Sequence, residues 1–162
     1  FDRGKTLVSI GAWVLMPNHF HIYITFSPMS DIGERNNISE FMRKLSTAYV
    51  MYFNKKYART GSLFEGKFKS KHVRRDNYFS YLFAYVHLNP VKLIQSNWRE
   101  VGIFDVNKTL DYIKDFYFSS FQDFFGENRK ESKILNTNSL PENFETDNVY
   151  DLFEWIKNSP QV

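Results

Sequence analysis

The sequence predicts an α+β fold, and three features of its hydrophobic pattern support this prediction. Residues Met16 to Phe26 alternate apolar with polar or aromatic side chains, which is typical of a half-buried β-strand. Apolar side chains recur at helical spacing from Ile38 to Phe53, and a second apolar helix is expected from Tyr78 to Leu88. Strands followed by helices along one chain favour an α+β architecture.

The first two strands are expected to form a hairpin. Residues Thr6 to Leu15 are rich in β-branched and aromatic side chains, and Pro17 breaks the pattern before the histidine strand returns. His19 and His21 fall on one face of that strand, as side chains two residues apart do. Tyr23 and Thr25 share this face. The even-numbered side chains are expected to be buried against helices: Phe20, Ile22, Ile24 and Phe26.

A loop is predicted over residues 27–36, and the two helices named above follow it with a strand between them. Asn37, with Glu40 three residues later, resembles a capping box at the start of the first helix. Alternating lysines predict a basic strand from Gly66 to Arg74. Asp76 is a plausible N-cap for the second helix. The regions after residue 91 are expected to form a packing segment around Trp98, a short helix over 120–125, a loose stretch over 129–148 and a last helix over 147–158.

The second predicted helix carries a tyrosine and an amide at a useful spacing. Tyr85 and Asn89 are four residues apart, so a helix places them on one face. Pro90 disfavours helical geometry at Asn89, which therefore lies at the helix end. His87 is expected to point elsewhere on the helix.

Positive charge is concentrated in the middle of the chain. Between Arg43 and Arg75 there are ten Lys or Arg and one acidic residue, a net +9. From Ser96 onward there are seven basic and twelve acidic residues, a net −5. This asymmetry favours a nucleic-acid surface, although lysines on a solvated helix face or a protected strand edge give the same pattern. The candidate DNA-binding residues are Arg43, Lys44, Lys67, Lys69, Lys71, Arg74 and Arg75.

The remaining composition excludes several kinds of site and of protein. With no Cys, disulfides and thiolate zinc sites are excluded. The apolar run from Ala12 to Met16 is too short to span a bilayer, and no secretion signal is visible, so we expect a cytoplasmic protein that is not in the membrane. Aromatic residues make up 19% of the chain, enough to fill a core and to stack on unpaired bases.

Three motifs in order, MPNHFH from Met16, GSLFEGKFKS from Gly61 and YVHLNPVK from Tyr85, resemble the single-tyrosine HUH transposases. The resemblance is closest to the REP-associated tyrosine transposases and covers about residues 6–125. It implies that Tyr85 is the nucleophile and that a divalent ion, Mg²⁺ or Mn²⁺, is bound by His19, His21 and Asn89. Imidazole ligands by themselves favour transition metals.

The same resemblance implies a ferredoxin-like (RRM-like) antiparallel sheet with helices on one face and a mostly helical C-terminal extension. A strand and a helix would normally precede the histidine hairpin, so we expect the chain to be a fragment. The corresponding division is a catalytic domain over 1–95, a packing segment of that domain over 96–126, and an acidic tail with a short helix over 127–162.

The implied activity is cleavage and rejoining of single-stranded or hairpin DNA through a 5′-phosphotyrosine, by a monomer or a homodimer. One alternative is a non-catalytic binder of single-stranded DNA or RNA with the same fold. Another is a metal-dependent hydrolase in which Tyr85 is only structural. Intact nucleophile and ligand positions favour the transposase.

Overall fold

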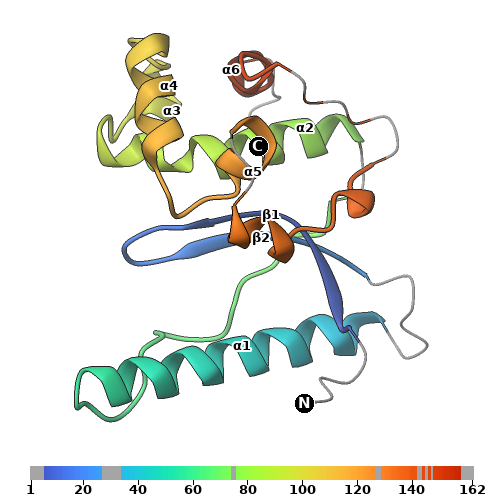
Figure 1. The fold of residues 1–162 in the computed structure, drawn as a ribbon, viewed down its shortest axis with the longest axis vertical. Helices are drawn as coiled ribbons and strands as arrows, with labels where there is room; N and C mark the ends of the chain where they lie inside the picture. The colour runs from blue at the N-terminus through green and yellow to red at the C-terminus, as the bar shows by residue number, and fades with distance from the viewer. Residues whose placement is uncertain are drawn as a thin grey trace. The chain divides into compact units, whose positions relative to one another are not determined.

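A computed structural model shows an α+β protein with a two-stranded antiparallel sheet (Figure 1). The structure describes residues 6–26, 34–73, 76–126, 129–141, 144, 146 and 148–157. The sheet consists of β1 (Val8–Leu15) and β2 (Phe20–Phe26). These bounds confirm the predicted class and the predicted hairpin.

The helices of the described residues follow the hairpin in sequence. They are α1 (Glu34–Lys56), α2 (Asp76–Leu88), the 3₁₀ helix η1 (Asn89–Leu93), α3 (Trp98–Val101), α4 (Val106–Asp115), α5 (Phe121–Phe125), the 3₁₀ helices η2 (Lys130–Ile134) and η3 (Thr137–Ser139), and α6 (Asp151–Lys157). None of the helices in the described part of the chain is both long and apolar enough to cross a bilayer.

The chain divides into two compact units. The first unit comprises Phe1–Ser9 and Ile24–His72, and the second comprises Ile10–Tyr23 and Val73–Val162. The first unit contains α1, and the second contains the hairpin turn and α2 to α6. His19, His21, Tyr85 and Asn89 therefore all belong to the second unit.

Segments distant in sequence hold the outer edge of β1. Ser120 N donates to Trp13 O at 2.8 Å, and Leu15 N donates to Phe118 O at 2.8 Å. Asn136 N donates to Ile10 O at 2.8 Å. The backbone groups of this edge are thus paired without another strand, which removes the cost of leaving them unsatisfied.

Aromatic and aliphatic side chains around α2 form the core of the second unit. Phe79 and Phe83 on α2 are buried, and they contact the rings of Tyr23, Phe124 and Phe144. The short helix α6 packs on α2 and buries its apolar face there (Figure 1). These contacts fix α2, and with it the tyrosine predicted to be the nucleophile.

The first unit differs from the sequence prediction at α1. The helix begins at Glu34 and not at Asn37, and Glu40 pairs with Arg43 instead of closing a capping box. Of the α1 side chains that the structure describes, only Met42 is buried. The helix ends at Lys56, before a turn in which Gly61 has a φ of 87°.

Two other predictions were wrong. The predicted strand from Gly66 to Arg74 is not formed: residues 66–73 belong to no helix or strand, and residue 74 lies outside the described residues. Alternation alone does not make a strand, because a strand also needs a partner to hydrogen-bond. The predicted loose stretch after Arg129 contains η2 and η3, and Arg129 is paired with Asp123 at 2.7 Å.

Candidate active site

The odd-numbered face of β2 packs against α2. The His21 ring lies 5.2 Å from the Tyr85 ring between centroids, edge to face at 72°, and the Tyr23 ring lies 4.7 Å from that of Phe79. The even-numbered side chains were predicted to be buried, but residues 20, 22 and 24 are only half-buried, as are residues 21, 23 and 25, and Phe26 is exposed. The histidine face is therefore the one that meets the core helix.

His19 lies just before β2, in the turn of the hairpin. Met16 N donates to His19 O at 2.8 Å and closes this turn. The His19 ring is exposed and lies 5.1 Å from the His21 ring. Its Nδ1 is 2.7 Å from Asn18 Oδ1, an oxygen that can only accept, so Nδ1 carries the hydrogen. The Nε2 lone pair of His19 is then available to a ligand.

His21 is half-buried, and its Nε2 is buried without a hydrogen-bond partner among the described residues. Burial lowers the pKa of His21, and the neighbouring His19 lowers it further. Both effects favour the neutral imidazole, which is the form that coordinates a metal.

Asn89 occupies the predicted position at the end of the tyrosine helix. The α-helix ends at Leu88, and Asn89 with Pro90 opens the 3₁₀ helix η1. Asn89 is 3% exposed, and its Oδ1 is buried without a partner among the described residues. An unpaired buried amide oxygen costs about 1–3 kcal/mol, and a ligand bound to this atom would remove that cost.

Tyr85 is bordered by two further side chains that the sequence did not predict. Arg99 lies over the Tyr85 ring, with its guanidinium carbon 5.0 Å from the centroid. The Tyr81 ring stacks with Tyr85 at 6.3 Å and 21°, and Arg99 Nη2 donates to the Tyr81 hydroxyl at 3.4 Å. The four-residue spacing of Tyr81 and Tyr85 could have indicated the first neighbour, but no local signal indicated Arg99.

His87 is fully buried and joins α2 to β1. Its Nδ1–H donates to Phe83 O at 2.9 Å, so its Nε2 accepts from Ser120 Oγ at 2.8 Å. Ser120 Oγ also accepts from Trp13 N at 2.9 Å. Burial lowers the pKa of His87 to about 3, which keeps the ring neutral. His87 thus points away from Tyr85, as predicted.

The predicted DNA-binding residues belong to the first unit as far as the structure describes them. Arg43 donates twice to Glu40 at 2.7 Å, and Lys44 lies 3.7 Å from the same carboxylate. The predicted basic strand face does not form, but its lysines are exposed in an irregular segment: Lys67, Lys69 and Lys71. Arg74 and Arg75 lie outside the residues whose side chains are described.

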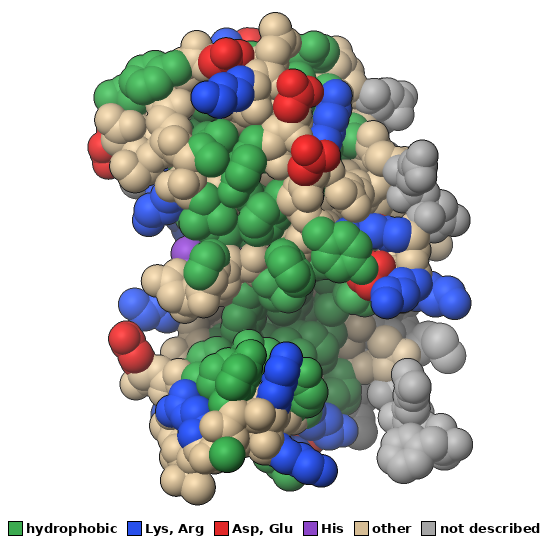
Figure 2. Space-filling model, turned by 60° about the vertical axis from the view of Figure 1, so that its left-hand side comes forward, with side chains coloured by type: hydrophobic (Ala, Val, Ile, Leu, Met, Phe, Trp, Pro, Cys, Tyr) green, Lys and Arg blue, Asp and Glu red, His purple; other side chains and the backbone are tan. Residues whose placement is uncertain are grey.

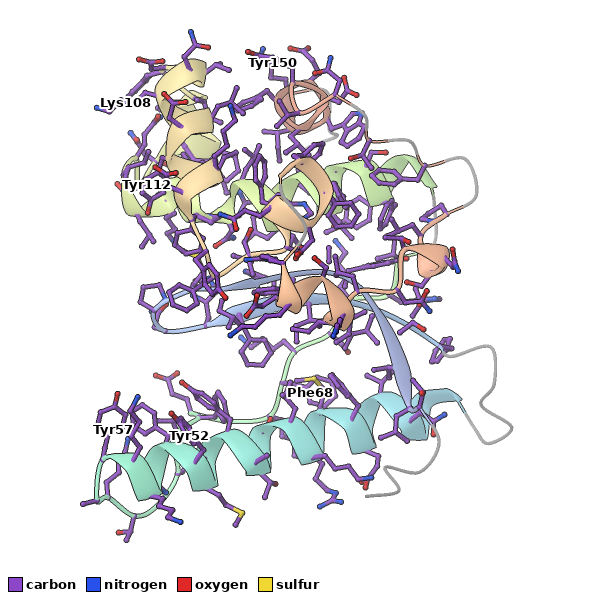
Figure 3. All side chains as sticks on the ribbon, viewed as in Figure 1. Tyr52, Tyr57, Phe68, Lys108, Tyr112 and Tyr150 are labelled. Carbon is purple, nitrogen blue, oxygen red and sulfur yellow. The ribbon has the colours of Figure 1, made fainter. Side chains whose placement is uncertain are left out.

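A surface not predicted as a binding site lies on the C-terminal half of α1 and its end. Tyr52 is 60% exposed and Tyr57 is 57% exposed, and Lys56 Nζ lies 5.7 and 5.4 Å from their ring centroids. Figure 3 shows both tyrosines near the C-terminal end of α1. Figure 2 shows apolar and Lys or Arg side chains next to each other over this helix. We call Tyr52, Lys56 and Tyr57 the α1 surface.

The predicted metal ligands are two histidines and one amide. Within the described residues, no group of three or more His, Cys, Asp or Glu side chains converges on a potential metal position. The predicted set contains only two such residues, His19 and His21, and takes its third ligand from Asn89. The unpaired atoms of His21 and Asn89 fit this ligand set, because metal ligands need a free lone pair.

The chain was compared with known proteins at three levels. No family model, curated protein or solved structure matches it.

Proposed function

We propose that this protein is a metal-dependent single-stranded-DNA transposase or nickase with Tyr85 as nucleophile. The observation that carries the proposal is the contact between Tyr85 and His21, whose rings lie 5.2 Å apart. A tyrosine beside a histidine that can bind a metal supports phosphodiester cleavage through a covalent intermediate, because tyrosine is one of the side chains that act as covalent nucleophiles. The finer fold that we propose is ferredoxin-like, because strand, strand and helix follow each other as in the middle of that βαββαβ unit.

In the proposed reaction, the Tyr85 oxygen attacks the phosphorus and the bond to the 3′ oxygen breaks. The phenolic proton leaves to solvent, and the departing 3′ oxygen takes a proton from water. His19, His21 and Asn89 are the residues that would hold a divalent ion, Mg²⁺ or Mn²⁺, whose charge polarises the phosphate when bound. The resulting 5′-phosphotyrosine keeps the bond energy, so a second 3′ hydroxyl can reverse the step without a nucleotide cofactor.

The test is covalent capture of labelled DNA. A pool of single strands containing hairpins is labelled at the 3′ end and incubated with the protein and Mn²⁺. A labelled band that migrates with the protein on a denaturing gel is expected, because the downstream strand carries the 5′ phosphate. Tyr85→Phe should abolish the band, whereas Tyr150→Phe, an exposed tyrosine of the same unit, should leave it unchanged.

A second candidate function is non-catalytic binding of single-stranded nucleic acid, which the α1 surface favours. Exposed rings next to a lysine are the usual means of binding unpaired bases without chemistry. Strand binding without an adduct would favour this function. A free 5′ phosphate on the product, again without an adduct, would instead indicate a hydrolase.

A further inference from the structure

Arg99 is held beside Tyr85 by a buried neighbour. It lies in α3 directly after Trp98, which is 2% exposed and part of the core of the second unit. Trp98 therefore anchors this short helix, while the Arg99 side chain is exposed and covers one face of the Tyr85 ring at 5.0 Å. The guanidinium group thus lies over the Tyr85 ring and next to the Tyr81 hydroxyl.

The charge of Arg99 is not neutralised. Within the part of the chain that the structure describes, no carboxylate pairs with it, and its one hydrogen bond goes to the Tyr81 hydroxyl at 3.4 Å. Arg129 in the same unit is different: it pairs with Asp123 at 2.7 Å and donates to the carbonyls of Tyr117 and Ser119. The N–H donors of Arg129 are used within the protein, whereas most of the five N–H donors of Arg99 remain for a ligand.

We propose that Arg99 binds a non-bridging oxygen of the phosphate that Tyr85 attacks, with Tyr81 as the residue that positions its guanidinium group. This inference rests on the proposed function, and it adds a phosphate-binding residue to that site. The planar fork of arginine matches a phosphate in two parallel hydrogen bonds. A phosphate in line with the Tyr85 oxygen lies next to the ring that Arg99 covers. Arg99 then supplies positive charge beside the Tyr85 ring, without exchanging a proton.

The first experiment measures binding of pyrophosphate and of a thymidine trinucleotide to the full chain without divalent ions. Arg99→Gln should weaken both about tenfold, as expected for loss of a charge-assisted hydrogen bond. Lys108→Gln, which removes an exposed charge from α4 of the same unit, should change them less than twofold. Arg99→Lys should fall between, because it keeps the charge and loses the fork.

The second experiment uses a trinucleotide with neutral methylphosphonate linkages. Arg99→Gln and wild type should bind it equally, since the charge that Arg99 recognises is missing. Equal effects of Arg99→Gln and Lys108→Gln would overturn the proposal, as would a wild type that binds neither pyrophosphate nor the charged strand.

The two proposals fail in different ways. If pyrophosphate binding depends on Arg99 but no DNA strand forms an adduct, the phosphate site stands and the proposed transposase function is wrong. If Arg99→Gln forms the adduct at the wild-type rate, the transposase stands and the role of Arg99 is wrong.

Discussion

The two units use the same kind of side chain in opposite ways. In the second unit the aromatic rings of Phe79, Phe83 and Phe121 are buried and contact other rings. In the first unit Tyr52 and Tyr57 are exposed beside Lys56. Aromatic content by itself therefore does not distinguish a core from a binding surface. The difference lies in burial and not in the kind of partner, because Tyr57 also contacts a ring, that of Phe53 at 4.5 Å, and is still exposed.

The largest expected effect is on the free energy of unfolding, and it tests the contrast between buried and exposed rings. Phe83→Ala should lower the free energy of unfolding by about 3–5 kcal/mol, because it opens a cavity among buried rings. Tyr52→Ala should change it by about 0.5 kcal/mol or less, because the side chain is exposed. Urea unfolding followed by circular dichroism measures both variants. Similar losses would show that Tyr52 is packed and that the contrast is wrong.

The second largest effect concerns the hydrogen bond between His87 and Ser120 in the second unit. His87→Phe should cost about 1–3 kcal/mol, because it removes two buried hydrogen bonds, one to Phe83 O and one from the Ser120 hydroxyl. His87→Phe combined with Ser120→Ala should cost less than the sum of the two single variants, since both remove the same hydrogen bond. Thermal melts of the two single variants and of the double variant measure the three losses of stability. A loss of stability in the double variant equal to the sum of the two single losses would show that His87 and Ser120 do not interact.

A third prediction concerns strand binding by the α1 surface. Removing both rings by Tyr52→Ala and Tyr57→Ala should weaken binding of single-stranded DNA by about 1–3 kcal/mol per base stacked, with little change in stability. Fluorescence anisotropy with a labelled poly-dT strand measures the affinity. Tyr150→Ala, another exposed tyrosine, is the matched control. Unchanged affinity in the double variant would show that these two rings take no part in strand binding.

The smallest expected difference lies among the metal ligands. His19→Ala or His21→Ala should raise the Mn²⁺ concentration needed for half-maximal adduct formation more than Asn89→Ala does. The imidazoles are paired at 5.1 Å, whereas the amide oxygen is a neutral ligand that water can partly replace. Titration of Mn²⁺ against adduct yield gives the order. If Asn89→Ala behaves like wild type at limiting Mn²⁺, the third ligand is another group.

Local features of the site could be predicted because neighbouring residues determine them. The turn at Pro17 and the alternation after it predict a hairpin that places His19 and His21 together, and the structure has this hairpin. Pro90 removes a donor and restricts Asn89, so the helix ends at Leu88 one turn after Tyr85. The roles of these four residues as nucleophile and metal ligands stay predictions.

Only the tertiary structure decided which surfaces meet. Period-two alternation defines two faces of β2 but does not determine which one meets α2, and the ring contacts of His21 and Tyr23 show that the histidine face does. Arg99 reaches Tyr85, and Ser120 reaches Trp13 across 107 residues, through packing that no local pattern records. The segment from Gly66 has the pattern of a strand and forms none in its described part, because pairing depends on a partner rather than on the segment itself.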